Sequence, residues 1–179
     1  GVKVREGVTA SRLVMEGTGV VGVSTSQGDF ACDTLVSTQN ICTAALEKWV
    51  GRPMPVVPER HAVLALECRQ APYTNAMPVF KDLSSRGMLY CRSYGGKQML
   101  VGGGLLGEQG RPSGNGQGGG PPDYVAEIGE QVAERFPAYD AAGLAASWTG
   151  VYDVTPDWNP VLGRVPGVQG LVVGFGFSG

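Results

Sequence analysis

The closing run Gly-Phe-Gly-Phe-Ser-Gly, residues 174–179, is the part of this sequence whose backbone is best suited to chemistry. Glycine lets a backbone approach a flat group closely, and amide N–H groups in such a run can stabilise negative charge that develops on a ligand. Taken alone, however, the same residues are explained more simply as a buried glycine-rich strand and turn. The run is therefore a candidate ligand site whose interpretation depends on the rest of the chain.

Few side chains offer catalytic chemistry. Taken alone, tyrosines such as Tyr90 and Tyr152 are ordinary residues of a β-sheet. His61, which follows Arg60, could act as a general base, but a structural or surface histidine is the simpler interpretation. The sequence shows no Ser-His-Asp set, no paired-carboxylate signature and no G-x-G-x-x-G loop that opens a helix. Residue types and spacing by themselves name no reaction.

Composition narrows the class of protein. The chain has 179 residues, of which 42% are hydrophobic and 17% charged, so it can bury a core. Its net charge of -2 gives no electrostatic case for nucleic acid, and no apolar stretch reaches the ~18 residues of a membrane span. The four cysteines lack C-x-x-C spacing, and no signal peptide is visible. We therefore expect reduced thiols, no metal site and a cytoplasmic protein.

The elements that must position these residues read as an α+β fold. Short β-rich runs joined by glycine turns predict an antiparallel meander over residues 8–31, and the apolar run 33–38 predicts a buried parallel strand followed by a helix over 42–50. A second, antiparallel sheet is predicted, with a helix over 123–136 whose N-cap is Asp123. A glycine-rich loop is expected over 102–122. The strands predicted for the second sheet and the end of the chain are 60–67, 77–83, 88–92, 98–102, 145–154 and 170–177.

Four stretches of the sequence, taken in their order along the chain, support a resemblance to a known family. Residues 6–10 (Glu-Gly-Val-Thr-Ala) with 19–29 suggest a meander, and residues 31–38 (Ala-Cys-Asp-Thr-Leu-Val-Ser-Thr) a returning strand. Residues 89–92 (Leu-Tyr-Cys-Arg) with 100–104 suggest a strand pair. The most specific stretch is 148–163 (Trp-Thr-Gly-Val-Tyr-Asp-Val-Thr-Pro-Asp-Trp-Asn-Pro-Val-Leu-Gly) with 167–179. In this order, the chain resembles the C-terminal part of the FAD-dependent D-amino-acid oxidase superfamily, which includes glycine and sarcosine oxidases.

That resemblance implies a domain organisation and a cofactor. Residues 1–51 would be part of a Rossmann-like FAD-binding domain, residues 52–154 a substrate domain, and residues 155–179 the return to the FAD-binding domain. The main chain near Ala10 would meet the adenine, and the amides of Gly176, Phe177, Ser178 and Gly179 would face the flavin. The family's N-terminal phosphate-binding fingerprint would precede Gly1, so the sequence looks truncated and its FAD site incomplete.

The sequence departs from the family pattern at three places. Tyr152 lies where glycine oxidase has a carboxylate-binding arginine, so another cation, Arg92 or Arg60, would have to bind a substrate carboxylate. Gly150 lies where monomeric sarcosine oxidase has its flavin-bonded cysteine, so FAD would be held without a covalent bond. Thr38 and Gln39, followed by Asn40, replace small residues at a cofactor-side turn and could crowd the nucleotide.

The resemblance implies an enzyme that oxidises the C–N bond of a small amino acid or secondary amine by hydride transfer to FAD. The candidate catalytic residues are Tyr152, Tyr90, Arg92 and His61. Its partners would be that small substrate and a missing N-terminal segment or a second copy in a homo-oligomer. Two alternatives remain open at this stage: a non-catalytic α+β fragment that does not hold FAD by itself, and a ligand-binding module.

Overall fold

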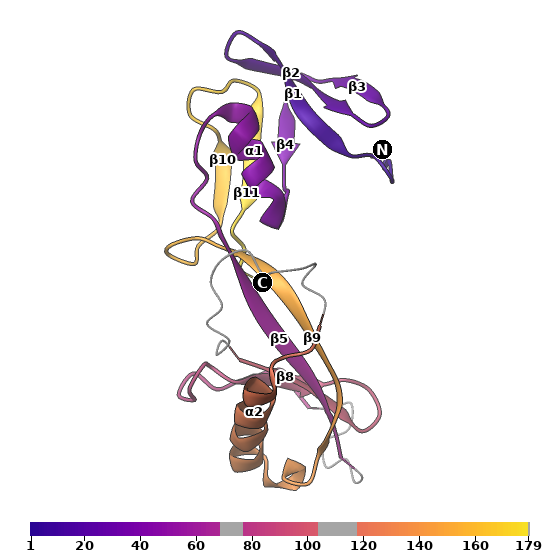
Figure 1. Ribbon diagram of the computed structural model, residues 1–179, viewed down its shortest axis with the longest axis vertical. Helices are drawn as coiled ribbons and strands as arrows, with labels where there is room; N and C mark the ends of the chain where they lie inside the picture. The colour runs from indigo at the N-terminus through magenta and orange to yellow at the C-terminus, as the bar shows by residue number, and fades with distance from the viewer. Residues whose placement is uncertain (69–76, 104–117, 179) are drawn as a thin grey trace. The chain divides into compact units, whose positions relative to one another are not determined.

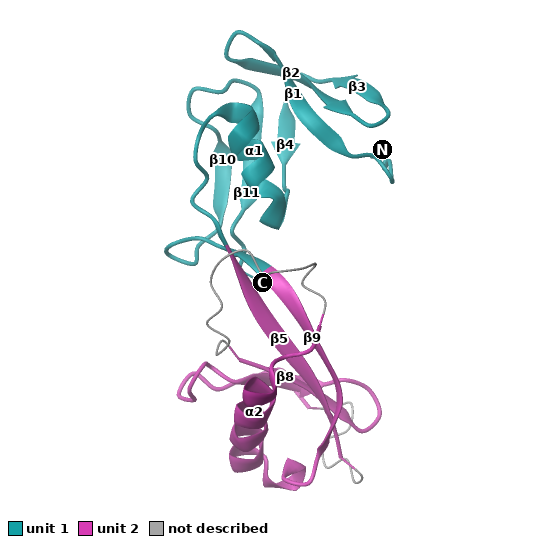
Figure 2. Cartoon of the chain, in the orientation of Figure 1, with its two compact units in different colours: residues 1–57, 152–179 teal, residues 58–151 magenta. Residues whose placement is uncertain are grey.

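The computed structural model describes residues 1–68, 77–103 and 118–178. The chain divides into two compact units, which Figure 2 distinguishes by colour. The first unit comprises residues 1–57 and 152–179, and the second comprises residues 58–151. The units change within two long strands, while the functional domains implied by the resemblance, residues 1–51, 52–154 and 155–179, stay a prediction. Each unit has its own cluster of buried hydrophobic residues.

The first unit begins with an antiparallel meander, as the sequence predicts. Strands β1 (Ala10–Glu16), β2 (Gly19–Thr25) and β3 (Gly28–Ala31) form a three-stranded sheet in that order (Figure 1). Alternate residues of β2 are buried, which is the pattern of a strand with one covered face. The amide of Val20 donates to the carbonyl oxygen of Gln169 at 2.8 Å, so the meander is tied to the C-terminal segment.

A second sheet in this unit contains the predicted parallel strand. Its strand order is β10 (Val161–Arg164), β11 (Leu171–Phe175) and β4 (Leu35–Ser37), with β11 and β4 parallel. A 3-10 turn (Asn40–Cys42) leads into helix α1 (Thr43–Val50). The buried cluster of this unit consists of Leu13, Val20, Leu46, Met54, Val165, Val168, Leu171, Val173 and Phe175.

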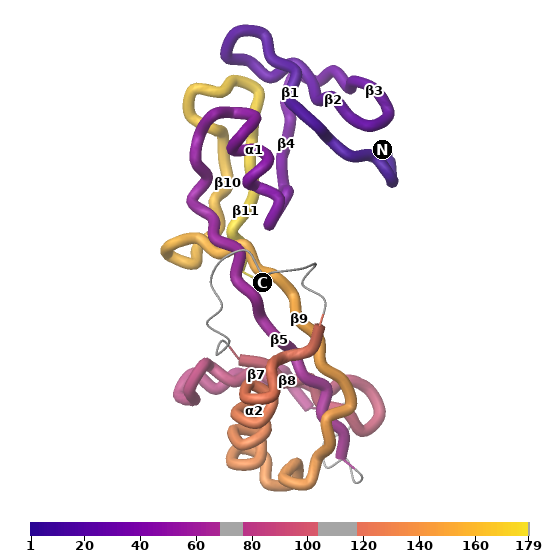
Figure 3. Tube along the Cα trace, viewed as in Figure 1, coloured from indigo at the N-terminus to yellow at the C-terminus, as the bar shows by residue number. Residues whose placement is uncertain are grey.

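The second unit is a five-stranded sheet with one long helix. The strand order is β6 (Phe80–Lys81), β7 (Tyr90–Ser93), β8 (Gln98–Gly102), β5 (Val57–Glu67) and β9 (Gly143–Val154). Figure 3 traces the hairpin from β7 to β8, which pair antiparallel. Helix α2 (Pro122–Arg135), followed by a 3-10 turn (Pro137–Tyr139), supplies buried residues to the same cluster as the sheet.

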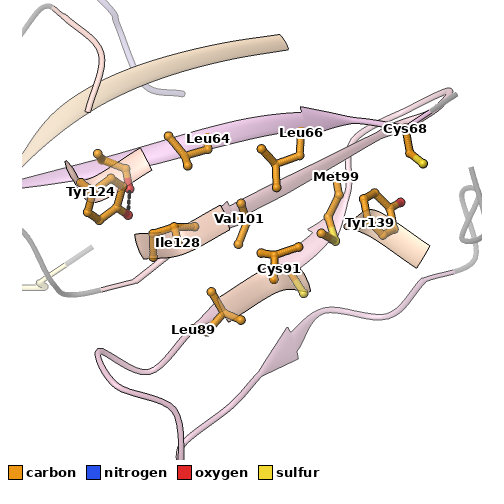
Figure 4. Close-up of a cluster of buried hydrophobic side chains, with 12 residues drawn as sticks. Leu64, Leu66, Cys68, Leu89, Cys91, Met99, Val101, Tyr124, Ile128 and Tyr139 are labelled. Carbon is orange, nitrogen blue, oxygen red and sulfur yellow. Dashed lines mark hydrogen bonds between the residues drawn. The ribbon is translucent and has the colours of Figure 1, made fainter. Parts of the chain in front are cut away.

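The core of the second unit lies between α2 and one face of this sheet (Figure 4). The apolar stripe predicted for the helix is confirmed, because Tyr124, Ile128 and Val132 are its buried residues. The Tyr124 hydroxyl donates to the carbonyl oxygen of Ala62 at 2.9 Å, which satisfies a polar group inside the core. The full cluster is Ala62, Leu64, Leu66, Cys68, Leu89, Cys91, Met99, Val101, Tyr124, Ile128, Val132 and Tyr139.

Two details of the second unit differ from the sequence-based prediction. The strand predicted over 77–83 is reduced to Phe80–Lys81, because the Asp82 carboxylate accepts hydrogen bonds from the Ser84 and Ser85 amides and starts a turn. Asp123 is not the N-cap of α2: Pro121 is the N-cap, and Asp123 lies in the first turn, where its charge favours the helix dipole. Most of the loop predicted over 102–122 lies outside the described residues.

The cysteines are free thiols in the structure. Cys68 and Cys91 are buried, and burial raises the pKa of the Cys91 thiol to about 11, so this thiol stays protonated near neutral pH. Within the described ranges, no group of three or more His, Cys, Asp or Glu side chains is arranged to hold a metal ion. No described helix is long and apolar enough to span a membrane. The predicted mixed α+β class with antiparallel sheets is confirmed.

Candidate active site

Tyr90 and Arg92 lie on the face of the five-stranded sheet that is opposite α2. In the register of β7, β8 and β5, Cys91, Val101 and Leu64 form one cross-strand row, and all three belong to the α2-side core. Side chains alternate along a strand, so the adjacent rows point the other way. These rows are Tyr90, Gly102 and Val63, and Arg92, Leu100 and Ala65. We call this side of the sheet the open face because α2 does not cover it, although Leu100 and Ala65 on it are themselves buried.

Glycine at position 102 makes room for the Tyr90 side chain. A Cβ atom on Gly102 would overlap the Tyr90 hydroxyl and its ring carbon, so the tyrosine ring lies across the neighbouring strand. Tyr90 is half-buried, whereas Arg92 is exposed. The sequence placed both residues in a substrate site, and the structure brings them to one face, two residues apart on β7.

Two further aromatic residues join this face, and the sequence reasoning missed them as site residues. The guanidinium carbon of Arg92 lies 5.7 Å from the ring centroid of Tyr94, and the Tyr94 and Trp148 ring centroids are 6.3 Å apart. The exposed fraction is 47% for Tyr94 and 39% for Trp148, so the two rings contact each other and are also accessible to solvent. Arg92, Tyr94 and Trp148 therefore form a cationic and aromatic cluster, which combines a carboxylate-binding group with flat apolar surface. The sequence could have indicated Tyr94, because it lies two residues after Arg92 and so on the same face of a strand. Nothing in the sequence indicated that Trp148 approaches Tyr94.

The imidazole of His61 contacts the carboxylate of Glu59. Its Nε2 lies 3.1 Å from Glu59 Oε1, and both side chains are about nine-tenths buried, being 11% and 10% exposed. Burial lowers the pKa of His61, although the charge and hydrogen bond of Glu59 act in the opposite direction. Alternation from Val63 places His61 and Glu59 on the open face, while Arg60, which is half-buried, points the other way. The proposed base role of His61 thus involves a neutral imidazole held by a carboxylate.

The C-terminal run leaves strand β11 at Gly176. This residue has a φ of +75°, and its amide donates to Asp153 Oδ2 at 2.6 Å within the first unit. A Cβ atom here would overlap the Thr155 methyl group, so the turn requires glycine. The strand predicted over 170–177 therefore ends at Phe175, and Phe177 is 55% exposed beyond it. Ser178 also has a positive φ, +58°.

A compact turn next to this run is held by Asp157. Its Oδ1 accepts from the Asn159 amide at 3.1 Å, and hydrogen bonds to Asn159 lower the pKa of Asp157. The Thr155 hydroxyl donates to the Asn159 carbonyl oxygen at 2.8 Å. The turn predicted at Pro156 and Asp157 is thus confirmed, and it fixes the Thr155 side chain that packs on Gly176.

The remaining predicted positions are spread over several elements. Ala10 is the exposed first residue of β1, paired with Thr25 of β2. Thr38 is exposed at the end of β4, with its methyl group facing Gly174, and Gln39 caps the 3-10 turn. Gly150 is exposed on β9, where an added Cβ would meet no atom within 4 Å.

Tyr152 is half-buried near the end of β9 and belongs to the first unit, whereas Tyr90, Arg92 and His61 belong to the second. Gly179 lies outside the described residues. The structure therefore places Tyr90, Arg92 and His61 in the second unit and the turn from Gly176 to Ser178 in the first, and it leaves the other predicted positions dispersed.

Comparison with known proteins decides the family. The model of the FAD-dependent oxidoreductase (DAO) family matches residues 1–179. The chain belongs to this family. The family predicted from the order of the four sequence stretches is thereby confirmed. Membership of this family associates the chain with FAD and with amino-acid oxidoreductases.

The chain is similar to several named enzymes. It is 29% identical over 180 residues to a D-amino acid dehydrogenase of Cereibacter sphaeroides, covering 96% of this chain and 37% of the relative. It is 27% identical to the 4-methylaminobutanoate oxidase (formaldehyde-forming) of Paenarthrobacter nicotinovorans, covering 99% and 22%. The chain thus spans well under half the length of these relatives.

Solved structures show the same fold. The L-proline dehydrogenase from P. horikoshii superposes with a TM-score of 0.79 at 20% identity, covering 96% of this chain and 44% of the other. Glycine oxidase from Geobacillus kaustophilus gives a TM-score of 0.71 at 21% identity, covering 93% and 42%. Because both identities are below 25%, these comparisons show a similar fold and nothing more.

Proposed function

We propose that the complete protein containing this chain oxidises the C–N bond of a small amino acid or secondary amine, with hydride transfer to a non-covalently bound FAD. Family membership supports the cofactor and the general class of reaction. The relatives include a D-amino acid dehydrogenase, a glycine oxidase and a 4-methylaminobutanoate oxidase. Each of these names specifies a substrate that carries both an amino group and a carboxylate.

The observation that carries the proposal is the cluster of Arg92, Tyr94 and Trp148 on the open face, beside Tyr90. An exposed guanidinium can bind a carboxylate through two parallel hydrogen bonds. This would supply the cation that Tyr152 cannot. The rings of Tyr94 and Trp148 would form an apolar wall against the carbon skeleton, and the Tyr90 hydroxyl would add one hydrogen bond. Such a face would orient the reacting C–H bond.

His61 would contribute a neutral imidazole to the same face. Because burial lowers its pKa, the ring favours the unprotonated form, which can accept a proton from an ammonium group. Glu59 would then stabilise the imidazolium that forms, since its carboxylate lies 3.1 Å from Nε2. Hydride donation requires the neutral amine, so this proton transfer would precede oxidation.

The described residues would form part of an FAD site. Bound flavin supplies a hydride acceptor. The chemistry of the turn after β11 suits the ring, because the amides of Phe177 and Ser178 follow a glycine that redirects the backbone. The Gly176 amide already donates to Asp153, so we assign the donor role to its successors. Ala10, Thr38, Gln39, Gly150 and Gly179 remain proposed cofactor contacts.

The test is a purified complete protein assayed for flavin absorbance and for turnover of glycine, sarcosine, dimethylglycine and D-amino acids. Both oxygen and an artificial electron acceptor should be supplied. Arg92→Gln should raise KM for carboxylate substrates by about 10- to 150-fold, because a hydrogen bond to a charged group is worth about 1.5–3 kcal/mol. Arg86→Gln is the matched control, since Arg86 is 81% exposed and contacts Glu127 of α2 instead.

Three outcomes would contradict the proposal. A colourless protein that takes up no FAD would favour the non-catalytic alternative. Saturable amino-acid binding without flavin reduction would favour a ligand-binding module. An unchanged KM in Arg92→Gln, with turnover intact, would remove Arg92 from the substrate site.

A further inference from the structure

Asp153 is a buried carboxylate whose visible partner is a backbone amide. The residue is 3% exposed, and its Oδ2 accepts from the Gly176 amide at 2.6 Å. Among the ion pairs of the described residues, none involves Asp153. Burying a carboxylate is costly unless hydrogen bonds compensate for the lost water. A side chain of this type at this place therefore needs an explanation beyond packing.

Asp153 acts on Gly176 together with Thr155. The two residues are two positions apart at and just beyond the end of β9, and Thr155 is also 3% exposed. The carboxylate holds the Gly176 N–H, while the Thr155 methyl group occupies the space that a Cβ would need. The Gly176 peptide is thereby restricted to one orientation, from which Phe177 emerges 55% exposed.

We propose that Asp153 is a positioning residue that orients the turn after β11, so that the amides of Phe177 and Ser178, and not that of Gly176, face the flavin. The identity of the ligand rests on the proposed function, whereas the orientation of the turn does not. A hydrogen bond to an ionised acceptor is about twice as strong as a neutral one, so the charge of Asp153 adds to the rigidity of the turn.

The charge of Asp153 has a second consequence. A fixed negative charge opposes the build-up of negative charge on a nearby group. The carboxylate would therefore make the bound flavin harder to reduce. A purely structural role would not affect this property, because asparagine could keep the hydrogen bond to Gly176 while removing the charge.

The first experiment needs no cofactor. Amide hydrogen exchange is measured by NMR in the 179-residue chain for the wild type, Asp153→Ala and Asp153→Asn, with Asp29→Asn on the exposed strand β3 as the control. In Asp153→Ala, exchange at Gly176 should accelerate at least about tenfold, while Leu171 in β11 changes far less. Unchanged exchange at Gly176 would overturn the proposal. If the alanine variant does not fold, Asp153→Asn decides the point, with faster exchange at Gly176 expected because a neutral acceptor makes a weaker hydrogen bond than a carboxylate.

The second experiment uses the complete protein loaded with FAD and measures its reduction potential by equilibration with a redox dye. Asp153→Asn should raise the potential and shift the visible absorption of the flavin, while Asp29→Asn should change neither. If both variants match the wild type, Asp153 has no role toward the flavin and the proposal fails. If the wild type binds no FAD, the proposed function fails, and the exchange rates alone decide whether Asp153 orients the turn.

Discussion

Replacing Gly176 with alanine should destabilise the first unit through two separable effects. At a φ of +75° a non-glycine residue pays about 1–2 kcal/mol for the left-handed backbone. The new Cβ would also overlap the methyl group of Thr155, a residue that is only 3% exposed and has little room to move. Overpacking of this kind costs about 1–3 kcal/mol. The sum is a loss of about 2–5 kcal/mol in the free energy of unfolding.

Urea unfolding followed by circular dichroism measures this loss. A scan of thermal stability should also show a drop in Tm of about 4–20 °C, at roughly 2–4 °C per kcal/mol for a chain of this size. Gly17→Ala is the matched control for the backbone effect, because Gly17 has a φ of +57° and an added Cβ would meet no atom within 4 Å. This control should lose only about 1–2 kcal/mol.

Thr155→Ser isolates the steric effect. Serine lacks the methyl group but keeps the hydroxyl that donates to Asn159. In the Thr155→Ser background, Gly176→Ala should therefore recover about 1–3 kcal/mol of its cost, which a double-mutant cycle measures directly. The reasoning is refuted if Gly176→Ala costs no more than Gly17→Ala, or if serine at 155 leaves the cost unchanged.

Three further predictions concern the second unit. Hydrogen bonds from Ser84 and the nearby Arg135 lower the pKa of Asp82 to about 2. The stabilising contribution of its charge is therefore present above about pH 4 and is lost as the pH falls toward 2. The difference in unfolding free energy between the wild type and Asp82→Asn, measured against pH, should vanish near pH 2. His61 is the single histidine, and NMR should show it titrating below pH 6.5. Glu59→Gln should lower the pKa of His61 further. The stability of the wild type should fall as the pH drops from about 6.5 toward the pKa of His61 in the folded protein, because the unfolded chain binds the proton first. Ile128→Ala should cost about 2–5 kcal/mol in urea unfolding because Ile128 is fully buried; a cost below 1 kcal/mol would contradict the packing of α2.

Much of the fold could be predicted from local patterns. The meander, the parallel strand before α1 and the apolar stripe of α2 follow from turn residues and hydrophobic periodicity, which depend on neighbours in the sequence. For the strand predicted over 77–83, a local side-chain interaction was overlooked. Asp82 redirected the backbone by accepting amide hydrogen bonds, which ended a strand that hydrophobicity alone would have continued.

The sequence by itself determined the family of this protein, because the order of its stretches and its closing glycine-rich run are properties of the chain. It also suggested Tyr90 and Arg92 as substrate contacts, which stay a prediction. Only the tertiary structure decided that Trp148 meets Tyr94, 54 positions earlier in the chain, and that the Asp153 carboxylate holds Gly176. These contacts depend on strand order, register and burial, which bring together residues that no local periodicity connects.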